Sequence, residues 1–508
     1  MNGLETLLLL FYGLVLAMLV IFGLHKYFLI YLYWEHRKTA FKQEVDDNNL
    51  PFVTIQLPLY NEQYVIARLI DSICNLDYPK ELFEVQVLDD STDETQTLGK
   101  DLVEKYQGQG FDIQYIHRTD RTGFKAGALD KGLQIAKGDF LAIFDADFVP
   151  NPDFLKKTVG YFQNKEIGMV QARWGHINRH YSMLTRIQSL FLDGHFVIEH
   201  IARNRSGRFF NFNGTAGLWR KQAIFDAGGW QHDTLTEDLD LSYRAQIAGW
   251  RFIYVHDVVA PAELPVEVNA YKSQQHRWAK GSVQTAKKML PVLWRSKAPL
   301  FIKVEGTIHL TSNFTYLFMT IPALFMPVIL DIQFERGWDW MVYVYLFVFF
   351  SASLSVIIYY LVAQIEGTKN WKSEVLYVPI LMAVGIGLSI NNARAVLEGI
   401  FNYTTEFKRT PKYRIENKKD DWNKKKYRSE LNLQPFVELL LGCYFTIGCL
   451  NFLERGELTS IPFFMLFQFG FLYIGLMSLM QNWRIRLAFR QVRHFLHSAF
   501  LALINRML

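Results

Sequence analysis

The sequence is poor in cysteine, with only three in 508 residues. Cys443 and Cys449 lie in a long apolar stretch and Cys74 lies far from both, so no metal-ligand spacing is present. Disulfide frameworks and structural zinc sites need several cysteines at short, regular intervals. The sequence therefore indicates neither a disulfide-stabilised domain nor a zinc site.

The chain also lacks a strong net charge and a dinucleotide-binding glycine motif. Its 54 Lys and Arg residues against 49 Asp and Glu give a formal charge of only +5, and the basic residues cluster beside apolar segments. This distribution favours a membrane surface over nucleic acid as the partner. No Gly-x-Gly-x-x-Gly follows the first expected strand, which argues against a dinucleotide cofactor.

Apolar residues, by contrast, are abundant and unevenly placed. They make up 50% of the chain, and 15% of its residues are aromatic. Residues 53–294 mix charges with short apolar runs, whereas residues 7–24 and several stretches after residue 314 are long and nearly uncharged. The sequence therefore predicts a membrane protein with one soluble domain at about residues 50–295.

An N-terminal transmembrane helix is expected within residues 1–34. Residues 7–24 are about long enough to cross the roughly 30 Å hydrocarbon core. A cleaved signal peptide would carry positive charge before its apolar run, whereas this chain has only Glu5 there. Basic residues follow the helix, so the positive-inside rule places the soluble domain in the cytoplasm. These residues are His36, Arg37, Lys38 and Lys42.

Five further apolar segments follow the soluble domain, and not all of them can cross the membrane. Residues 399–431 carry ten Lys or Arg against five acids, so they are expected on the cytoplasmic side. Because three apolar segments precede this loop, one of the three cannot cross fully. We choose residues 375–397, whose polar second half suits an interfacial or re-entrant helix. The segments are 314–330, 341–362, 375–390, 436–453 and 461–480, and the polar residues are Asn391, Asn392 and Arg394.

This arrangement predicts about five full crossings. The tail from residue 481 has five Arg and no acid, and we expect it to form an interfacial helix that faces phosphate head groups. The protein should lie in a bacterial inner (plasma) membrane with its catalytic domain in the cytoplasm. The expected regions are interfacial and transmembrane helices at 296–398, a basic cytoplasmic loop at 399–431, transmembrane helices at 432–480 and the interfacial helix at 481–508.

The soluble domain alternates strand and helix patterns. Such alternation predicts an α/β domain with a mostly parallel sheet, in which ligands bind outside the carboxyl ends of the strands. Strands are expected at 52–57, 84–88, 112–116 and 140–144, with helices at 61–73 and 126–136.

The stretch at residues 140–147, FLAIFDAD, ends a buried strand with two carboxylates. Asp145 and Asp147 are suited to hold a hard divalent cation against a diphosphate, because such cations prefer oxygen ligands. An acidic cap at the strand end is the structural alternative for this pair.

Five other motifs of the soluble domain can likewise be explained either by the chemistry of a binding site or by local structure alone. A Lys at the start of a helix suits a phosphate. Carboxylates at a strand end or in the first turn of a helix are common caps, and an Arg beside a Trp is a common surface pair. The motifs are Asp89–Asp90, Lys125-Ala126-Gly127, Asn213-Gly214-Thr215, Thr236-Glu237-Asp238 and Gln274-Gln275-His276-Arg277-Trp278.

Taken in this order, the motifs resemble those of the processive family 2 glycosyltransferases, which include cellulose, hyaluronan and chitin synthases. The resemblance is greatest to the cellulose-synthase-like mannan and glucan synthases and their bacterial relatives, and it covers about residues 50–295. It implies a nucleotide-sugar-binding domain of the GT-A type. It also implies an enzyme that transfers a hexose with inversion from UDP-glucose or GDP-mannose to a growing β-linked polysaccharide.

The resemblance gives each motif a role. Asp238 is the expected general base with Glu237 in support, and Asp147 with Asp145 is expected to hold Mg²⁺ or Mn²⁺. Trp278 offers an aromatic face to the acceptor sugar. Donor contacts are expected from Asp89, Asp90, Lys125, Asp145, Gln274 and Arg277, and further acceptor contacts from Asn213, Gly214 and Thr215.

Beyond the soluble domain the resemblance is looser. Phe407, Thr410 and Lys412 are similar to the gating loop of cellulose synthases, but basic residues stand here where that family has an apolar one. A solvated basic membrane flank is the alternative for this segment.

Two other functions compete with a polysaccharide synthase. One is the transfer of a single sugar to a membrane lipid such as ceramide, diacylglycerol or a polyprenyl phosphate. The other is a transporter or scaffold with a nucleotide-sensing domain, which is disfavoured because few charges fall within the apolar segments. The sequence identifies no export partner and does not decide between the donors.

Overall fold

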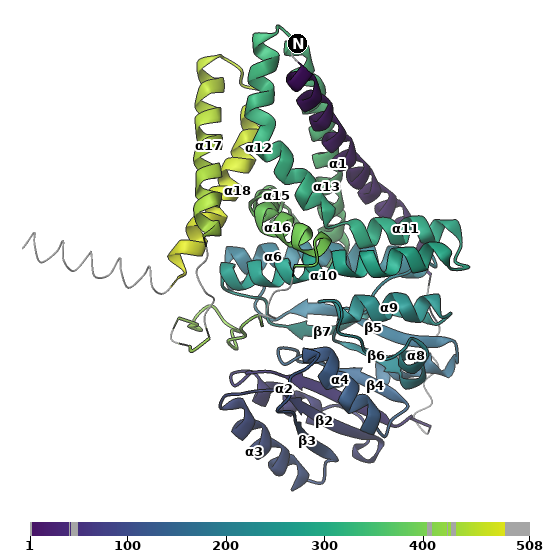
Figure 1. The fold of residues 1–508 in the computed structure, drawn as a ribbon. Coiled ribbons are helices and arrows are strands. Elements are labelled where there is room, and N and C mark those ends of the chain that lie inside the picture. Colours follow the sequence, from purple (N-terminus) through teal and green to yellow (C-terminus); the bar gives the residue numbers. More distant parts are fainter. Residues whose placement is uncertain are drawn as a thin grey trace, which may run out of the picture.

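The computed structural model describes residues 3–39, 41, 49–403, 409–423, 425–427 and 433–482. Figure 1 shows a sheet domain below a bundle of long helices, with the helices α10 (Val268–Arg295) and α11 (Leu300–Thr311) running crosswise between them. The soluble and membrane parts expected from the sequence are therefore two layers of one structure.

A seven-stranded sheet forms the centre of the soluble domain, in the order β3-β2-β1-β4-β6-β5-β7. The first four strands along the chain pair in parallel, β5 pairs in parallel with β7, and β6 is antiparallel to both of its neighbours. The expected α/β fold with a mostly parallel sheet is confirmed. The strands are β1 (Val53–Leu59), β2 (Phe83–Asp89), β3 (Ile113–His117), β4 (Phe140–Ile143), β5 (Ile167–His176), β6 (Gly217–Arg220) and β7 (Arg251–Ala262).

Helices cover both faces of this sheet, so its central strands are buried on both sides. All seven residues of β2 are buried. Helices α2 and α3 pack with Val53 and Ile55 on one face, and α4 and α8 pack with Leu141 and Ile143 on the other. The helices of this domain are α2 (Ile66–Cys74), η1 (Lys80–Leu82), α3 (Thr95–Gln107), α4 (Phe124–Ile135), α5 (Lys156–Val159), η2 (Gly160–Gln163), α6 (Met183–Asp193), η3 (Gly194–Glu199), α7 (His200–Arg205), α8 (Lys221–Asp226) and α9 (Glu237–Ile247).

Helix α2 begins five residues later than the sequence predicted, at Ile66 rather than Asn61. Asn61 has a left-handed backbone with φ of 55°. Its backbone N–H donates to the Ser91 hydroxyl at 2.7 Å, and its side-chain oxygen accepts from the Thr92 N–H at 2.8 Å. These bonds tie the end of β1 to the end of β2, so the residues between β1 and α2 contribute to the strand-end surface.

Four helices of the described chain are long and apolar enough to cross a membrane, and two bent helix pairs raise the number to six if each pair forms one span. The five expected crossings lie within this range. The pair α15–α16 bends by 47° inside the segment that we expected not to cross, and α11–α12 bends by 52°. The long helices are α1 (Gly3–His36), α13 (Asp339–Gly367), α17 (Gln434–Glu454) and α18 (Ile461–Met480), and the others are α12 (Phe314–Glu335), α14 (Trp371–Val375), α15 (Val378–Gly387) and α16 (Ser389–Ile400).

Helix α1 is longer than the apolar run predicted. Its 34 residues correspond to about 51 Å at 1.5 Å per residue, which exceeds the roughly 30 Å membrane core. The excess reaches the soluble domain, where Lys26 Nζ donates to Glu199 Oε1 at 2.6 Å. At the other end of the chain, the interfacial helix expected at 481–508 lies outside the described residues apart from Gln481 and Asn482.

Candidate active site

A cavity of about 200 Å³ lies at the carboxyl ends of the strands and is lined on one side by Gln274, Arg277 and Trp278 of α10. It gathers side chains from strand ends, from the first turns of α4 and α9, from α10 and from the segment after residue 409. Residues from both halves of the sequence therefore form one site. Of the residues singled out from the sequence, those that line the cavity are Asp90, Lys125, Asp145, Asp147, Asn213, Gly214, Glu237, Asp238, Gln274, Arg277, Trp278, Thr410 and Lys412.

Asp145 is held in place at the end of β4. Its backbone N–H donates to the Thr215 hydroxyl at 2.9 Å, so Thr215 supports the cavity wall from behind. Lys125 Nζ donates to Asp145 Oδ1 at 2.5 Å and to the Gly214 carbonyl at 2.9 Å. Burial opposes the charge on Lys125, but the neighbouring carboxylates, Asp145 first, raise its pKa above the ordinary value. An ammonium group therefore remains beside Asp145.

Asp147 carries a different cation. The buried Lys412 Nζ donates to Asp147 Oδ2 at 2.6 Å and to the Glu263 carbonyl at 2.7 Å. Close by, Arg409 pairs with Glu62 at 2.6 Å. The segment after residue 409 is thus docked into the cavity through its cations, whereas Phe407 lies outside the described residues.

Glu237 and Asp238 occupy the first turn of α9. Burial, followed by the charge of Glu237, raises the pKa of Asp238 to about 7. The turn at Gly214 lies against Asp238 and leaves no room for a side chain, because a Cβ atom at Gly214 would lie 2.9 Å from Asp238 Oδ2. The backbone φ of Gly214 is 80°. A carboxyl group with a pKa near neutrality, in a closely fitted cavity, is suited to exchange a proton with a substrate.

A second cavity, of about 330 Å³, adjoins the first and extends toward the membrane helices. Asp238, Asn213, Gln274 and Trp278 line both cavities. Gln274 and Trp278 are one turn apart on α10, so they project from the same face of the helix. Aromatic and amide side chains of the second cavity include Phe191, Asn313, Tyr316, Tyr359 and Tyr360.

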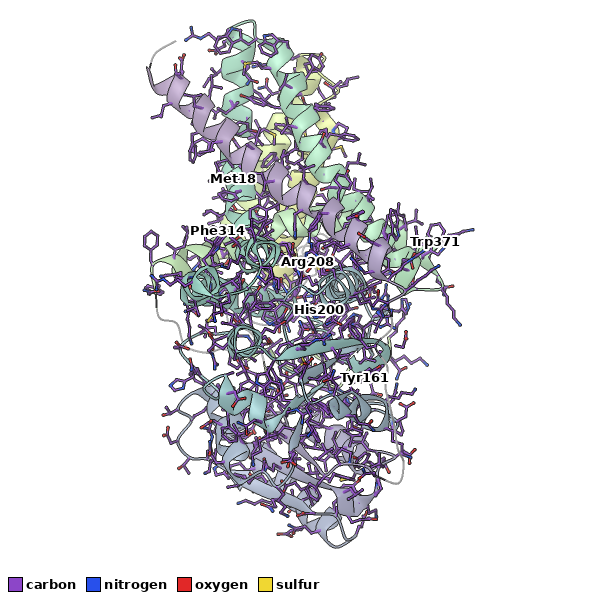
Figure 2. The ribbon with its side chains drawn as sticks, turned by 90° about the vertical axis from the view of Figure 1, so that its right-hand side faces the viewer. Met18, Tyr161, His200, Arg208, Phe314 and Trp371 are labelled. Carbon is purple, nitrogen blue, oxygen red and sulfur yellow. The ribbon has the colours of Figure 1, made fainter. Side chains whose placement is uncertain are left out.

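The polar floor of the second cavity is an ordered network. η3 is a π-helix inserted between α6 and α7, a local geometry that is frequent at functional sites. It carries His195, which contacts Glu199 at 3.1 Å and the Asn213 amide nitrogen at 2.9 Å, while the Asn213 oxygen lies 2.5 Å from His200. Figure 2 shows His200 between the sheet and the long helices. The network orients the Asn213 amide at the boundary of the two cavities.

Two of the predicted site residues stand outside the cavity wall. Asp89 is fully buried and accepts bonds from the Ser91 N–H at 3.0 Å and the Tyr115 hydroxyl at 2.5 Å, so it fixes the turn after β2. Its neighbour Asp90 reaches the wall and forms a two-point pair with Arg118, at 2.7 and 2.5 Å. Thr215 acts through Asp145, as described above.

Sequence reasoning assigned no site role to several residues that line the first cavity, among them Arg121, which it placed only in the segment that opens α4. Arg121 stacks on Tyr60, with its guanidinium carbon 3.2 Å from the ring centre. Trp174 and His176 stand two residues apart at the end of β5, so both side chains lie on the same face of the strand. This spacing at a strand end was the signal that could have identified them. The other ionisable residues in this group of cavity-lining residues are Glu62, Glu263 and Arg409.

Residues 51–281 match the protein family described as "Glycosyltransferase like family 2". The chain is 44% identical over 274 residues to "Probable glucomannan 4-beta-mannosyltransferase 11" of Oryza sativa subsp. japonica. The aligned region covers 52% of this chain and 47% of the relative. It is also 44% identical over 266 residues to "Glucomannan 4-beta-mannosyltransferase 1" of Cyamopsis tetragonoloba, covering 51% and 50%. The chain thus spans about half the length of the curated relatives it matches.

A solved structure shares the fold. Mannosyltransferase PcManGT from Pyrobaculum calidifontis, in complex with GDP-Man and Mn²⁺, superposes with a TM-score of 0.51 at 20% identity. The match covers 77% of this chain and 100% of that one. At this identity the likeness shows a common architecture alone.

Proposed function

We propose that this chain, whose residues 51–281 form a family 2 glycosyltransferase domain, transfers a hexose from a nucleotide sugar to the growing end of a β-linked polysaccharide. The observation that carries the proposal is the position of Asp238. This carboxyl group, with a pKa raised to about 7 by burial and by Glu237, lies where a charged cavity meets an aromatic one.

The charged cavity is proposed as the donor site. Two carboxylates, Asp145 and Asp147, supply the oxygen ligands that Mg²⁺ or Mn²⁺ prefers, and no group of three metal-binding side chains exists among the described residues. Such a set fits a cation that takes its other ligands from a substrate diphosphate. When bound there, the cation neutralises the leaving diphosphate.

The chain's own residues are proposed to complete the transfer. Asp238 accepts the proton of the attacking acceptor hydroxyl, and burial, followed by the charge of Glu237, keeps the pKa of Asp238 close to physiological pH. Lys125 and Arg277 face the same cavity and are proposed to stabilise the negative charge that develops on the diphosphate. Asp90, which lines the same cavity, is proposed to contact the nucleoside.

GDP-mannose is the proposed donor, ahead of UDP-glucose. The curated relatives are named as mannosyltransferases, and the solved neighbour contains GDP-Man. Purified protein in nanodiscs with Mn²⁺ or Mg²⁺ should release nucleoside diphosphate from GDP-mannose faster than from UDP-glucose or UDP-N-acetylglucosamine. Faster release from either UDP-sugar would overturn the donor assignment.

The proposed acceptor is a carbohydrate chain rather than a lipid. Trp278 stands at the boundary of the cavities, where its ring can stack on a terminal sugar that is renewed after each addition. Radiolabelled donor should give material that stays at the origin of a thin-layer plate and is digested by an endo-β-glycanase. Trp278→Ala should lose this material but retain donor binding. Label confined to a single-sugar lipid would replace the synthase with a lipid glycosyltransferase.

The finer topology is part of the proposal. Residues 399–431 and the soluble domain are proposed to share the cytoplasmic side of a bacterial inner membrane, because both carry the positive charge next to the helices. In a background without native cysteines, an impermeant maleimide should label Thr459→Cys but not Lys418→Cys in intact cells. The opposite pattern would invert the topology.

A further inference from the structure

The carboxyl end of β5 presents two aromatic nitrogen heterocycles to the proposed donor cavity. Trp174 and His176 are two residues apart, so they project from the same face of the strand. Both line the cavity of about 200 Å³. Gly175 between them lies so close to β7 that a Cβ atom would be 2.7 Å from Val259 Cγ1. The neighbouring strand therefore fixes the backbone that carries the pair.

His176 is buried without satisfying its ring. Its side chain is 3% exposed, and neither ring nitrogen has a hydrogen-bond partner among the described residues. Asp193 Oδ1 lies 3.9 Å from His176 Nε2, beyond hydrogen-bond distance, while Asp193 Oδ2 accepts from Arg179 at 2.7 Å and Gln364 at 3.1 Å. Burial lowers the pKa of His176 to about 4. The ring is neutral at physiological pH and offers one donor and one acceptor.

Trp174 has an equivalent property. Its indole Nε1 is buried and has no hydrogen-bond partner among the described side chains and backbone groups. The ring packs against Phe148 and Phe196, with centroid distances of 5.3 and 5.1 Å. Unlike His176, it lines both cavities, as does Asp238, where the transferred sugar is proposed to meet the acceptor. The neighbouring rings hold the N–H in a fixed direction.

An unpartnered buried nitrogen alone does not identify a binding group, because Trp219 and Trp230 also have one. These two rings belong to the hydrophobic core and line neither cavity. Trp174 and His176, by contrast, carry their unpaired nitrogens on side chains that line a cavity. A buried polar group costs free energy until it is paired, so such a pair favours a ligand that supplies the missing bonds.

We propose that Trp174 and His176 hydrogen-bond the hydroxyl groups of the donor hexose and thereby determine which hexose is accepted. A hydroxyl both donates and accepts, which matches an N–H donor beside a neutral imidazole. A diphosphate would instead need cations, and these stand on other elements as Lys125, Arg277 and Lys412. The inference rests on the proposed function, since it assigns the sugar part of the same donor.

The test measures binding of GDP-mannose and of GDP to the full-length protein in nanodiscs. Trp174→Phe keeps an aromatic ring but removes the N–H together with the five-membered ring of the indole, and His176→Phe removes both ring nitrogens. Each should weaken GDP-mannose binding by about tenfold while GDP binding stays unchanged, because only the sugar loses bonds. His176→Gln, which retains a donor and an acceptor, should recover part of the loss. Trp219→Phe is the matched control, and it should change neither affinity.

Deoxy analogues make the assignment specific. Wild-type protein should bind one of the 2-, 3-, 4- or 6-deoxy forms of GDP-mannose about tenfold more weakly, and the variant that lacks the matching nitrogen should bind that analogue and GDP-mannose equally. Equal losses for GDP and GDP-mannose, or no loss in either variant, would overturn the inference. If wild-type protein transfers another hexose, the same comparison is made with that donor and its diphosphate. Absence of any hexose transfer by the wild type overturns the proposed function, whereas normal transfer with unaltered sugar affinity in both variants overturns only this inference.

Discussion

Asp147 and Asp238 line the same cavity but have opposite electrostatic environments. Asp147 follows the central strand β4, and the ammonium group of Lys412 lies 2.6 Å from its oxygen. Asp238 lies in the first turn of α9, where burial and the neighbouring Glu237 raise its pKa to about 7. The helix N-terminus would by itself favour an ionised Asp238, so burial and like charge outweigh it here.

The difference separates two chemical tasks. A carboxylate already paired with a cation is suited to exchange that cation for another, as a metal ligand must. A carboxyl group that is costly to ionise is suited to take up a proton at neutral pH. One cavity thus contains the proposed cation site and the proposed proton site.

The largest expected effect comes from removing the proton site. Asp238→Asn should reduce hexose transfer by about 1,000-fold or more, because general base catalysis contributes on this scale. Donor affinity should change little, since the amide keeps the shape of the side chain. Transfer is measured with radiolabelled donor, and affinity by calorimetry. Parallel loss of donor binding would show that Asp238 belongs to the cation site.

The same variant has a stability signature. The pKa of Asp238 is 3.8 in the reference state and about 7 in the folded protein, so the folded state binds the proton more tightly. The unfolding free energy of the wild type should therefore fall as pH rises from about 4 to 7. Asp238→Asn lacks this fall. Compared with the wild type, the variant should therefore gain stability between pH 5 and pH 8, which thermal unfolding of both proteins can measure.

The second effect concerns the cation site. Asp147→Asn should weaken metal-dependent donor binding by about 100-fold, because an amide cannot balance the charge of a divalent cation. Isothermal titration with and without Mn²⁺ measures this. Unchanged metal dependence would mean that Asp147 serves only as the end of β4.

The carboxylates of the proposed cation site could be placed at a strand end from the sequence because the signal is local. A buried run of apolar residues that ends in Asp145 and Asp147 predicts both the strand and the surface that its end reaches. Strands β1 to β4 appear within two residues of their expected bounds for the same reason. Alternation and apolar runs encode such elements directly.

The partners of these residues could not be found in this way. Lys412 stands in a basic segment whose composition fits a solvated flank equally well, and only the folded chain brings it to Asp147. The same holds for His176, whose unpaired nitrogens are a property of its surroundings. Helix α2 illustrates a local conflict, since the hydrogen bonds of Asn61 to the neighbouring strand end delay the helix.

A smaller effect should follow from removing the cation that Lys412 supplies. Lys412→Met keeps the length of the side chain and frees Asp147 from its ion pair, so half-maximal activity should need about severalfold less Mn²⁺. Lys418→Met, an exposed position of the same segment, is the matched control and should leave the metal requirement unchanged. A higher requirement in Lys412→Met would indicate that Lys412 instead helps to retain the donor.

The smallest effect is expected at Glu237, and it tests why Asp238 titrates near neutrality. Asp238 must be ionised to accept a proton, so kcat/KM should fall below about pH 7 in the wild type. Glu237→Gln removes the like charge but not the burial, which is the larger cause of the raised pKa. The acidic limb of the profile should therefore move toward lower pH without reaching the ordinary range of an aspartate. Glu237→Asp retains the negative charge and should keep the limb near its wild-type position. If the limb of Glu237→Gln stays in place, burial alone sets the pKa of Asp238. If it moves toward higher pH, the titrating group is not Asp238, and the contrast between the two carboxylates loses its basis.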